Sequence, residues 1–241
     1  MDETSHSSDG LASLLVQAPE VNFNGQGGLL QAVNIRGFAR WRIQTLIEGI
    51  PIYTERRAGT SAEFIPPAFI GQAYLTAGAA STQLGSGAIG GGLDLHLSIP
   101  EQQQVQLTYG HNQDYRDILV QGSTESLSLE NGSEDSFSWQ LNHRHANNST
   151  DGQNNPVSDR FEQQSIALRK RFENSLFQEG LLVYSSTNNI AKASSDDPNN
   201  RFTLYPKNDH LLGKMTFDWH NASVYFHDSV LDTVTTRPGK R

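Results

Sequence analysis

Glycine is the first residue type whose spacing suggests chemistry in this sequence. Residues 76–95 contain Gly85-x-Gly87-x-x-Gly90, the spacing by which a dinucleotide-binding loop approaches a pyrophosphate. That chemistry requires a strand before the glycines, a helix after them and an acidic residue about twenty residues later. Residues 93–99 instead alternate apolar and polar side chains, which predicts a half-buried strand. A nucleotide-dependent enzyme is therefore disfavoured.

Two histidines provide the next candidate for chemistry. His143 and His145 share one face of an expected strand, with Cα atoms about 7 Å apart, close enough to hold one metal ion. No third ligand is evident, so we do not predict a metal site. The nucleophile and zinc patterns Ser-x-x-Lys, Gly-x-Ser-x-Gly and His-Glu-x-x-His are absent. We therefore expect no catalytic residue, no cofactor and no enzyme activity.

Composition limits the remaining classes of protein. The chain has 241 residues, a net charge of −8 and no cysteine, which excludes a disulfide scaffold. No basic stripe marks a nucleic-acid-binding surface. No run of eighteen apolar residues predicts a membrane-spanning helix, although barrel strands of about ten alternating residues would escape such a search. The N-terminus lacks the pattern of a signal peptide, so the chain is either cytoplasmic or preceded by further sequence.

The elements that position these residues differ between the two halves of the chain. In the first hundred residues, local signals predict short elements joined by turns. They are a short helix capped near Ser7–Asp9 and ended near Pro19, strands over 33–35, 43–47 and 73–75, a turn over 48–51, a polar loop over 53–64 and a short helix beginning at Pro66. After Pro100, apolar and polar residues alternate, with the apolar side chains expected to face outward and the polar side chains inward, as in a barrel with a wet lumen. Strands are expected near 103–109, 115–128, 135–146, 160–172, 177–189, 210–219 and 222–233, with short and long connections alternating.

Three motifs follow one another in the first hundred residues. They are Asn34-Ile-Arg-Gly-Phe38, Leu46-Ile-Glu-Gly-Ile-Pro51, and Gly78-Ala-Ala-Ser81 with Leu84-Gly-Ser-Gly-Ala-Ile-Gly-Gly91. In this order they resemble the plug domain of the TonB-dependent outer-membrane receptors. Residues 11–21 resemble the helix and Pro-Gly-Val element that precede these motifs, with Glu20 where glycine is usual. The resemblance covers roughly residues 7 to 98.

The resemblance implies a mainly β fold with two domains. A small α+β plug would occupy residues 1–100, inside the N-terminal part of a transmembrane antiparallel β-barrel whose first strands, about seven, would occupy residues 101–241. Plugged transporters of this kind close at 22 strands. An open seven-stranded sheet would leave unpaired edges in lipid. We therefore expect a truncated chain that lacks a signal peptide, a TonB box and most of the barrel.

The resemblance also implies a contact between the plug and the barrel wall. Arg36 would lie at this contact, and Glu48 stands where the family usually has aspartate. The family commonly has arginine just before the glycine of the third motif and proline just after it, where this chain has Thr76-Ala77 before Gly78 and Ala79 after it. The usual charge cluster is thus expected to be half-formed, with carboxylate partners beyond residue 241. The plug glycine motif, Gly78, Gly85, Gly87, Gly90 and Gly91, is expected to permit tight turns at the wall.

Loop 53–64 would lie at the outward apex of the plug, where the substrate arrives. Arginine side chains there would suit an anionic ferric chelate, because guanidinium groups bind oxyanions through paired, charge-assisted hydrogen bonds. The alternative is that Arg56 and Arg57 are an ordinary solvated pair on a loop. The candidate substrate-binding residues are Tyr53, Glu55, Arg56 and Arg57, with Arg40 and Trp41 as a second group.

The function implied is active transport across the outer membrane of a Gram-negative bacterium. The parent protein would bind a scarce nutrient, most often a ferric siderophore, and TonB with its inner-membrane complex would supply the energy. Outer-membrane lipid would surround the barrel, and no nucleic acid is expected as a partner. Cobalamin, haem, a saccharide or another metal remain alternative substrates. A soluble β-rich protein that binds surfaces or carbohydrates remains the alternative from another class.

Overall fold

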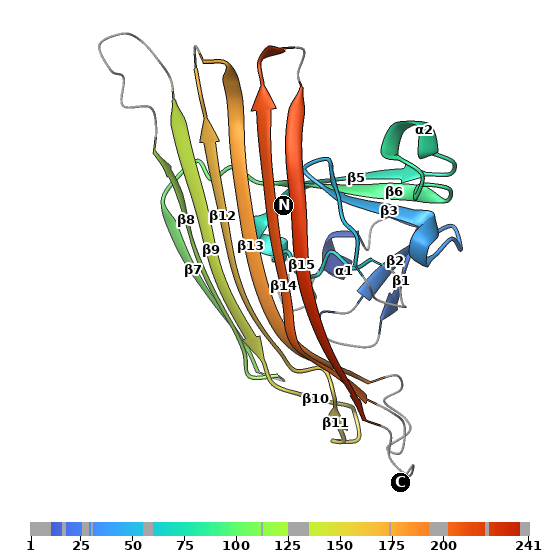
Figure 1. Cartoon of the computed structure of the whole chain (residues 1–241). Coiled ribbons are helices and arrows are strands. Elements are labelled where there is room, and N and C mark those ends of the chain that lie inside the picture. The colour runs from blue at the N-terminus through green and yellow to red at the C-terminus, as the bar shows by residue number, and fades with distance from the viewer. Residues whose placement is uncertain are drawn as a thin grey trace.

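The computed structural model describes residues 11–15, 18–25, 29, 31–54, 60–111, 113–124, 135–173, 175–192, 202–219 and 222–236. The chain has two parts, a small α+β part and a long sheet that stands against it (Figure 1). We call the first part, through residue 97, the plug, and the long sheet the wall. The predicted mainly β fold with a small α+β plug is confirmed.

Two small sheets form the centre of the plug. Strands β1 (Val21–Gly25) and β2 (Gln31–Ile35) pair as a hairpin. The second sheet has the order β4-β3-β6-β5, in which β3 (Ile43–Ile47) runs parallel to β6 (Gly91–Leu97). All five residues of β3 are buried, as expected for a strand covered on both faces. The other elements are α1 (Leu11–Leu15), η2 (Arg40–Arg42), β4 (Ile50–Pro51), η3 (Pro67–Phe69), β5 (Ile70–Ala77) and α2 (Ser81–Leu84).

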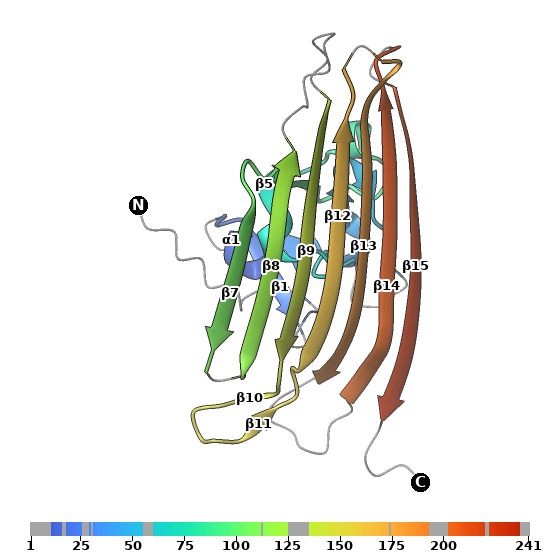
Figure 2. The same cartoon turned by 90° about the vertical axis from the view of Figure 1, so that its left-hand side faces the viewer.

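The wall is a seven-stranded antiparallel sheet in which neighbours along the chain are neighbours in space (Figure 2). Its order is β15-β14-β13-β12-β9-β8-β7. A two-stranded hairpin, β10 (Ser149–Thr150) and β11 (Pro156–Val157), projects from the connection between β9 and β12. The wall strands are β7 (Gln104–Gly110), β8 (Tyr115–Thr124), β9 (Ser136–Ala146), β12 (Phe161–Arg171), β13 (Phe177–Lys192), β14 (Phe202–Phe217) and β15 (Ser223–Thr236).

Side chains of the wall alternate between two faces of opposite character. On β9 the side chains of Gln140 and Asn142 are buried against the plug, whereas Leu141 between them is 42% exposed on the other face. Burial alternates in the same way along β8 and β12, where Tyr115, Leu119 and Phe161 add apolar side chains to the inward face. Large apolar side chains exposed on the outward face include Val105, Leu107, Tyr109, Ile118, Phe137, Leu182, Tyr184, Val224 and Val230.

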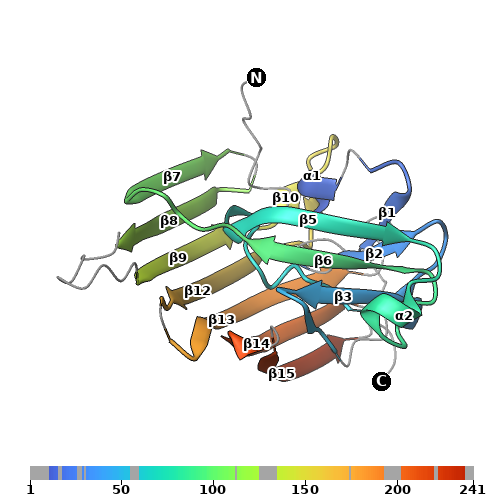
Figure 3. The ribbon, with the colours of Figure 1, turned by 90° about the horizontal axis from the view of Figure 1, so that it is seen from above.

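The plug lies against one face of the wall (Figure 3), and apolar side chains from both parts meet in one core. The plug contributes buried residues such as Ile47 and Leu95, and the wall contributes Leu119, Val183 and Leu212. The plug is thus fixed to one face of the wall by burial as well as by polar contacts. Among the residues that the structure describes, no helix is long and apolar enough to cross a membrane.

Two details of the chain differ from the sequence-based expectation. Residues 190–209 were expected to form one long polar connection, but β13 continues to Lys192 and β14 begins at Phe202. Polar residues there still complete the antiparallel ladder, so pairing continues beyond the apolar part of the strands. The glycine-rich stretch, whose glycines were expected to permit tight turns, also contains the one-turn helix α2.

Candidate plug–wall contact site

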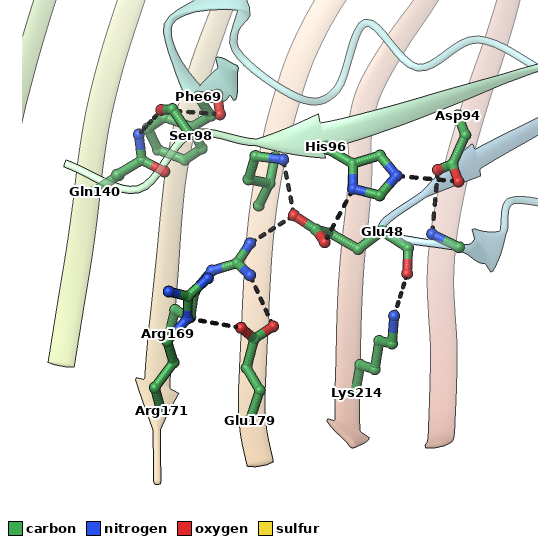
Figure 4. Close-up of polar contacts among 12 residues, drawn as sticks. Glu48, Phe69, Asp94, His96, Ser98, Gln140, Arg169, Arg171, Glu179 and Lys214 are labelled. Atoms are coloured by element: carbon green, nitrogen blue, oxygen red, sulfur yellow. Dashed lines mark hydrogen bonds and ion pairs between the residues drawn. The ribbon is translucent and has the colours of Figure 1, made fainter. Parts of the chain in front are cut away.

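A tight turn presents the acidic group of the site. Glu48 and Gly49 join β3 to β4, and both have positive φ, 54° and 74°, as in a two-residue hairpin turn. Glutamate seldom adopts this conformation, so other contacts must hold it. Glu48 Oε1 accepts a hydrogen bond from the backbone N–H of Leu97 at 2.8 Å, and the N–H of Gly49 donates to Asp94 Oδ1 at 3.1 Å. The plug therefore fixes the Glu48 carboxylate toward the wall (Figure 4).

Cationic side chains of the wall meet this turn. Arg169 of β12 donates from Nη2 to Glu48 Oε1 at 2.5 Å and from Nη1 to Glu179 Oε1 at 2.7 Å. Arg171 donates from Nε to the second oxygen of Glu179 at 3.3 Å, and Lys214 Nζ donates to the backbone carbonyl of Glu48 at 2.7 Å (Figure 4). The side chains of Glu48 and Arg169 are only 8% and 9% exposed. Charge-assisted bonds shielded from water to this degree are stronger than those at a surface.

His96 lies between the acidic side chains of Glu48 and Asp94. Its Nδ1 is 3.7 Å from Glu48 Oε2, and its Nε2 is 3.2 Å from Asp94 Oδ2. The ring also packs edge-on against Tyr74, with centroids 5.1 Å apart. His96 therefore helps to orient both carboxylates that support the Glu48 turn.

A second contact joins the end of β6 to β9. Gln140 Nε2 donates to Ser98 Oγ at 3.0 Å, and Ser98 Oγ donates to the carbonyl of Phe69 at 3.3 Å (Figure 4). The backbone N–H of Ser98 donates to the same carbonyl at 2.7 Å. Gln140 also donates to Gln121 of the neighbouring strand at 3.1 Å. This contact fixes the point at which the chain leaves the plug for the wall.

A third contact holds the plug segment around Phe64. Gln163 Nε2 donates to the carbonyls of Phe64 at 2.7 Å and Glu63 at 3.2 Å, and Ser185 Oγ donates to the carbonyl of Phe64 at 2.5 Å. The ring of Phe64 stacks on the ring of His210 with centroids 3.7 Å apart and planes 9° from parallel. Backbone carbonyls of the plug are thus satisfied by side chains of the wall.

The two predicted plug–barrel residues occupy different surroundings. Glu48 lies in the buried contact with Arg169 and Lys214. Arg36 has a φ of 49° and donates from Nη2 to Glu20 Oε1 at 2.7 Å, and both side chains are substantially exposed. The ion pair of Arg36 within the described residues is therefore internal to the plug, and its role at the wall stays a prediction.

The predicted substrate-binding residues divide into two groups. Arg40 and Trp41 lie in η2, at the start of β3, where they line a hollow of about 420 Å³ together with Gly37, Ala39 and Arg42. Trp41 is 57% exposed and Tyr53, which follows β4, is 66% exposed. No contact within the described part of the chain joins Tyr53 to Arg40 or Trp41. Glu55, Arg56 and Arg57 lie outside the described residues.

The plug glycine motif surrounds α2 and the start of β6. Gly91 has a φ of 132°, and a Cβ atom there would overlap the carbonyl oxygen of Thr76 on β5. A Cβ atom at Gly90 would overlap the ring of Phe38. These glycines therefore allow close packing inside the plug. The other members of the motif are Gly78, Gly85 and Gly87. Of the two departures from the family pattern, Thr76 pairs with Gly92 across the sheet, and Ala79 lies between β5 and α2.

Several residues of the site were not predicted from the sequence. Strand alternation does place Arg169 on the face opposite Ile166 and Leu168, which is the inward face. Nothing in the local sequence connects Arg169 with Glu48, because the two are 121 residues apart. Strand alternation also places other polar wall residues of the site on the inward face, but it does not predict what they contact. They are Gln163, Glu179, Ser185, His210 and Lys214.

Comparison with known proteins gives a family for the plug and a fold for the whole chain. Residues 3–92 match the family model described as the TonB-dependent Receptor Plug Domain. The whole chain is similar in fold to the copper transporter OprC, with a TM-score of 0.70, 15% identity, and coverage of 95% of this chain and 35% of that chain. The siderophore receptor PiuA from Acinetobacter baumannii matches with a TM-score of 0.65, 15% identity and coverage of 94% and 35%.

The FrpB iron transporter from Neisseria meningitidis matches with a TM-score of 0.65, 12% identity, and coverage of 93% of this chain and 39% of that chain. The chain thus spans 35% to 39% of the length of these three solved structures. The comparison with curated proteins gave no match.

Proposed function

Because residues 3–92 are the plug domain of a TonB-dependent receptor, we propose that this chain is part of an outer-membrane transport receptor of a Gram-negative bacterium. The receptor binds a scarce nutrient outside the cell and admits it to the periplasm, with TonB and its inner-membrane complex supplying energy. A ferric siderophore is the proposed substrate. The receptor selects by binding and transports by displacing the plug, and it breaks no bond in its cargo.

The observation that carries this proposal is the polar contact between the plug and the wall at Glu48 and Arg169. Burial of this ion pair and of the carbonyls around Phe64 is compensated by partners from the wall. If the plug moves, water can replace those partners, whereas an entirely apolar contact would expose only groups that water does not bind. A displaceable plug is consistent with such an interface.

The outward face of the wall supports a membrane location. Val105, Leu107 and Tyr109 on β7 are 66%, 73% and 66% exposed, and further large apolar side chains follow on the other strands. An apolar surface of this extent is a liability in water and is suited to lipid. It therefore favours the transport receptor over a soluble carbohydrate-binding protein.

Two observations support a ferric siderophore as the substrate: the names of the proteins with a similar fold, and the charged residues proposed for the plug apex. The neighbours in fold are named as a siderophore receptor, an iron transporter and a copper transporter. Arg56 and Arg57, with Tyr53 and Glu55, are proposed to meet an anionic chelate, since guanidinium groups bind oxyanions well. Arg40 and Trp41 are proposed as a second group.

Growth on defined iron sources tests the proposal. A receptor-deleted strain is grown on a panel of ferric chelates with and without the full-length parent, and uptake of the supporting chelate is measured with and without TonB. We expect TonB-dependent growth on at least one ferric siderophore. Equal growth on every chelate, with or without the parent, would exclude siderophore transport and direct the search to cobalamin, haem, saccharides or other metals. Fractionation of the parent in buffer without detergent would exclude a membrane receptor altogether.

A further inference from the structure

Two histidines on neighbouring wall strands face each other beside the plug. His210 of β14 is 2% exposed, and its Nδ1 lies 3.1 Å from Nε2 of His227 on β15. Their ring planes are 4° from parallel, with centroids 5.4 Å apart. Phe64 of the plug stacks on His210 at 3.7 Å, and its centroid is 6.4 Å from that of His227. The three centroid distances make a nearly right angle at His210. Because Phe64 stacks on the face of His210, His227 must lie at the edge of the His210 ring, in the same plane.

A third side chain fixes which nitrogen of His210 carries the proton. Asn208 donates from Nδ2 to Thr187 Oγ1 at 3.0 Å, so its Oδ1 faces His210 Nε2, 3.1 Å away. An amide oxygen only accepts, and His210 Nε2 must therefore carry the hydrogen. The Nδ1 lone pair of neutral His210 then points toward Nε2 of His227. Histidine ligands of metal ions are commonly oriented by a hydrogen bond of this kind on the other ring nitrogen.

We propose that His210 and His227 form a two-nitrogen binding site for a monovalent d10 metal ion, Cu(I) or Ag(I). Two coplanar rings whose nitrogens face each other offer donors in a line, the arrangement that these ions accept with two ligands. Imidazole nitrogen is a suitable donor for copper. Among the residues that the structure describes, no group of three His, Cys, Asp or Glu side chains could hold a metal ion, which disfavours the tetrahedral site that zinc requires.

Metal binding requires one proton shift and a small movement. The proton on Nε2 of His227 moves to Nδ1 of the same ring, so both imidazoles remain neutral and the ion brings a single charge. Nitrogen–metal bonds of about 2.0 Å require the two nitrogens to separate from 3.1 Å to about 4 Å. His227 is half-buried, so its ring has room to move.

The test measures copper binding by the full-length parent in detergent and does not depend on its transport activity. Cu(I) is titrated anaerobically against a chromogenic chelator for the unchanged protein, His210→Ala and His227→Gln, with His143→Ala as the control because His143 lies on the outward face. We expect both site variants to bind one equivalent less than the unchanged protein and the control to bind the same amount. Asn208→Ala should weaken the site about tenfold, as loss of an orienting partner does.

X-ray absorption of the bound copper identifies its ligands. Two nitrogen neighbours at about 2.0 Å and no sulfur are expected for the copper that the site variants lose. Equal copper binding by the unchanged protein and His227→Gln would show that the pair is a structural hydrogen bond, and would overturn the proposal. Since His227 is half-buried whereas His210 is buried, His227→Gln keeps the test valid even if His210→Ala fails to fold.

Discussion

Glu48 and Arg169 are separated by 121 residues in the chain, yet a carboxylate oxygen of one lies 2.5 Å from a guanidinium nitrogen of the other. The contact joins a turn of the plug to the middle of the wall, and both side chains are buried. Arg169 also binds Glu179, so one guanidinium is shared by two carboxylates. Removal of Arg169 would leave the buried carboxylate of Glu48 without its arginine and would leave Glu179 with Arg171 alone.

We predict that Arg169→Ala destabilises the protein by about 3–5 kcal/mol, the usual cost of breaking a buried ion pair from one side. Arg169→Lys should recover part of the loss, because an ammonium keeps the charge but not the fork of two donors. Denaturant unfolding of the full-length receptor in detergent measures the effect. The control is Arg116→Ala, whose partner Asp114 and own side chain are exposed and whose loss should cost less than about 1 kcal/mol. Equal unfolding midpoints for the two alanine variants would contradict the prediction.

We predict that Gln163→Leu loosens the plug segment around Phe64. The leucine is similar in size but removes the hydrogen bonds of Gln163 to the carbonyls of Glu63 and Phe64 and to the buried guanidinium of Arg144, while the Phe64 carbonyl keeps a second donor, Ser185. Each buried group left unpaired costs about 1–3 kcal/mol. Limited proteolysis within the plug should therefore be faster than in the unchanged protein. Gln164→Leu is the control, since Gln164 is exposed on the outward face and should tolerate leucine.

We predict that Gly91→Ala destabilises the plug by about 1–3 kcal/mol or more, because φ is 132° and the new Cβ would overlap the Thr76 carbonyl. Gly152→Ala is the matched control, since nothing lies within 4 Å of a Cβ atom at that position. Thermal unfolding of both variants in detergent compares them. A control that loses as much stability as Gly91→Ala would show that the backbone conformation of Gly91 does not matter.

We predict that the hairpin loop around Asp151 is ordered by the ionised carboxylate. Hydrogen bonds from the Asn155 side chain and backbone, and from the Gln153 backbone, hold the pKa of Asp151 below its usual value of 3.8. A lowered folded-state pKa contributes stability that is present above the unfolded-state pKa and is lost as pH falls through the folded-state pKa. The amide shifts of Gln153 and Asn155 in an NMR pH titration should therefore change with a midpoint below 3.8.

The asparagine variant provides the check on this prediction. Asn155→Ala removes the largest cause of the lowered pKa, so the titration midpoint should rise toward 3.8. A midpoint at or above 3.8 in the unchanged protein would show that the carboxylate gains nothing from these bonds.

We predict that the double substitution Arg56→Gln and Arg57→Gln weakens binding of the chelate identified by the growth panel by about tenfold or more, as expected for loss of charge-assisted hydrogen bonds. Isothermal titration with the purified receptor measures the change in Kd. Arg116→Gln, on the outward face, should leave Kd unchanged. If both proteins bind the chelate equally well, the apex arginines do not select the substrate.

Local sequence patterns predicted much of the fold, because turns and the alternating faces of strands depend on residues that are close in the sequence. The expected strand over 43–47 matches β3, since an apolar run ends there at a tight Glu-Gly turn. The period-two alternation after residue 100 predicted the inward and outward faces of the wall. The alternation did not predict where β13 and β14 end, because polar residues beyond the apolar band still form ladder hydrogen bonds with their neighbours.

The candidate site was less predictable because its partners come from distant parts of the chain. Alternation alone places Arg169 inward, but its contact with Glu48 depends on how the plug stands against the wall. The same holds for His210 and His227, which are 17 residues apart and meet only through the pairing of β14 with β15. Motif resemblance named Glu48 as a contact residue, but it pointed to carboxylate partners beyond residue 241 and gave no indication that Glu48 would face an arginine.

The sign of the charges at the Glu48 contact limits which plugs this wall can accept. Here the plug contributes the acid and the wall contributes Arg169 and Lys214. A plug transplanted from another receptor with a neutral or basic residue at the equivalent turn would place Arg169 opposite no counter-charge. Chimeric receptors built on this wall should therefore assemble only when the donor plug carries an acidic residue there, which makes the exchange of plugs between receptors a question of charge matching.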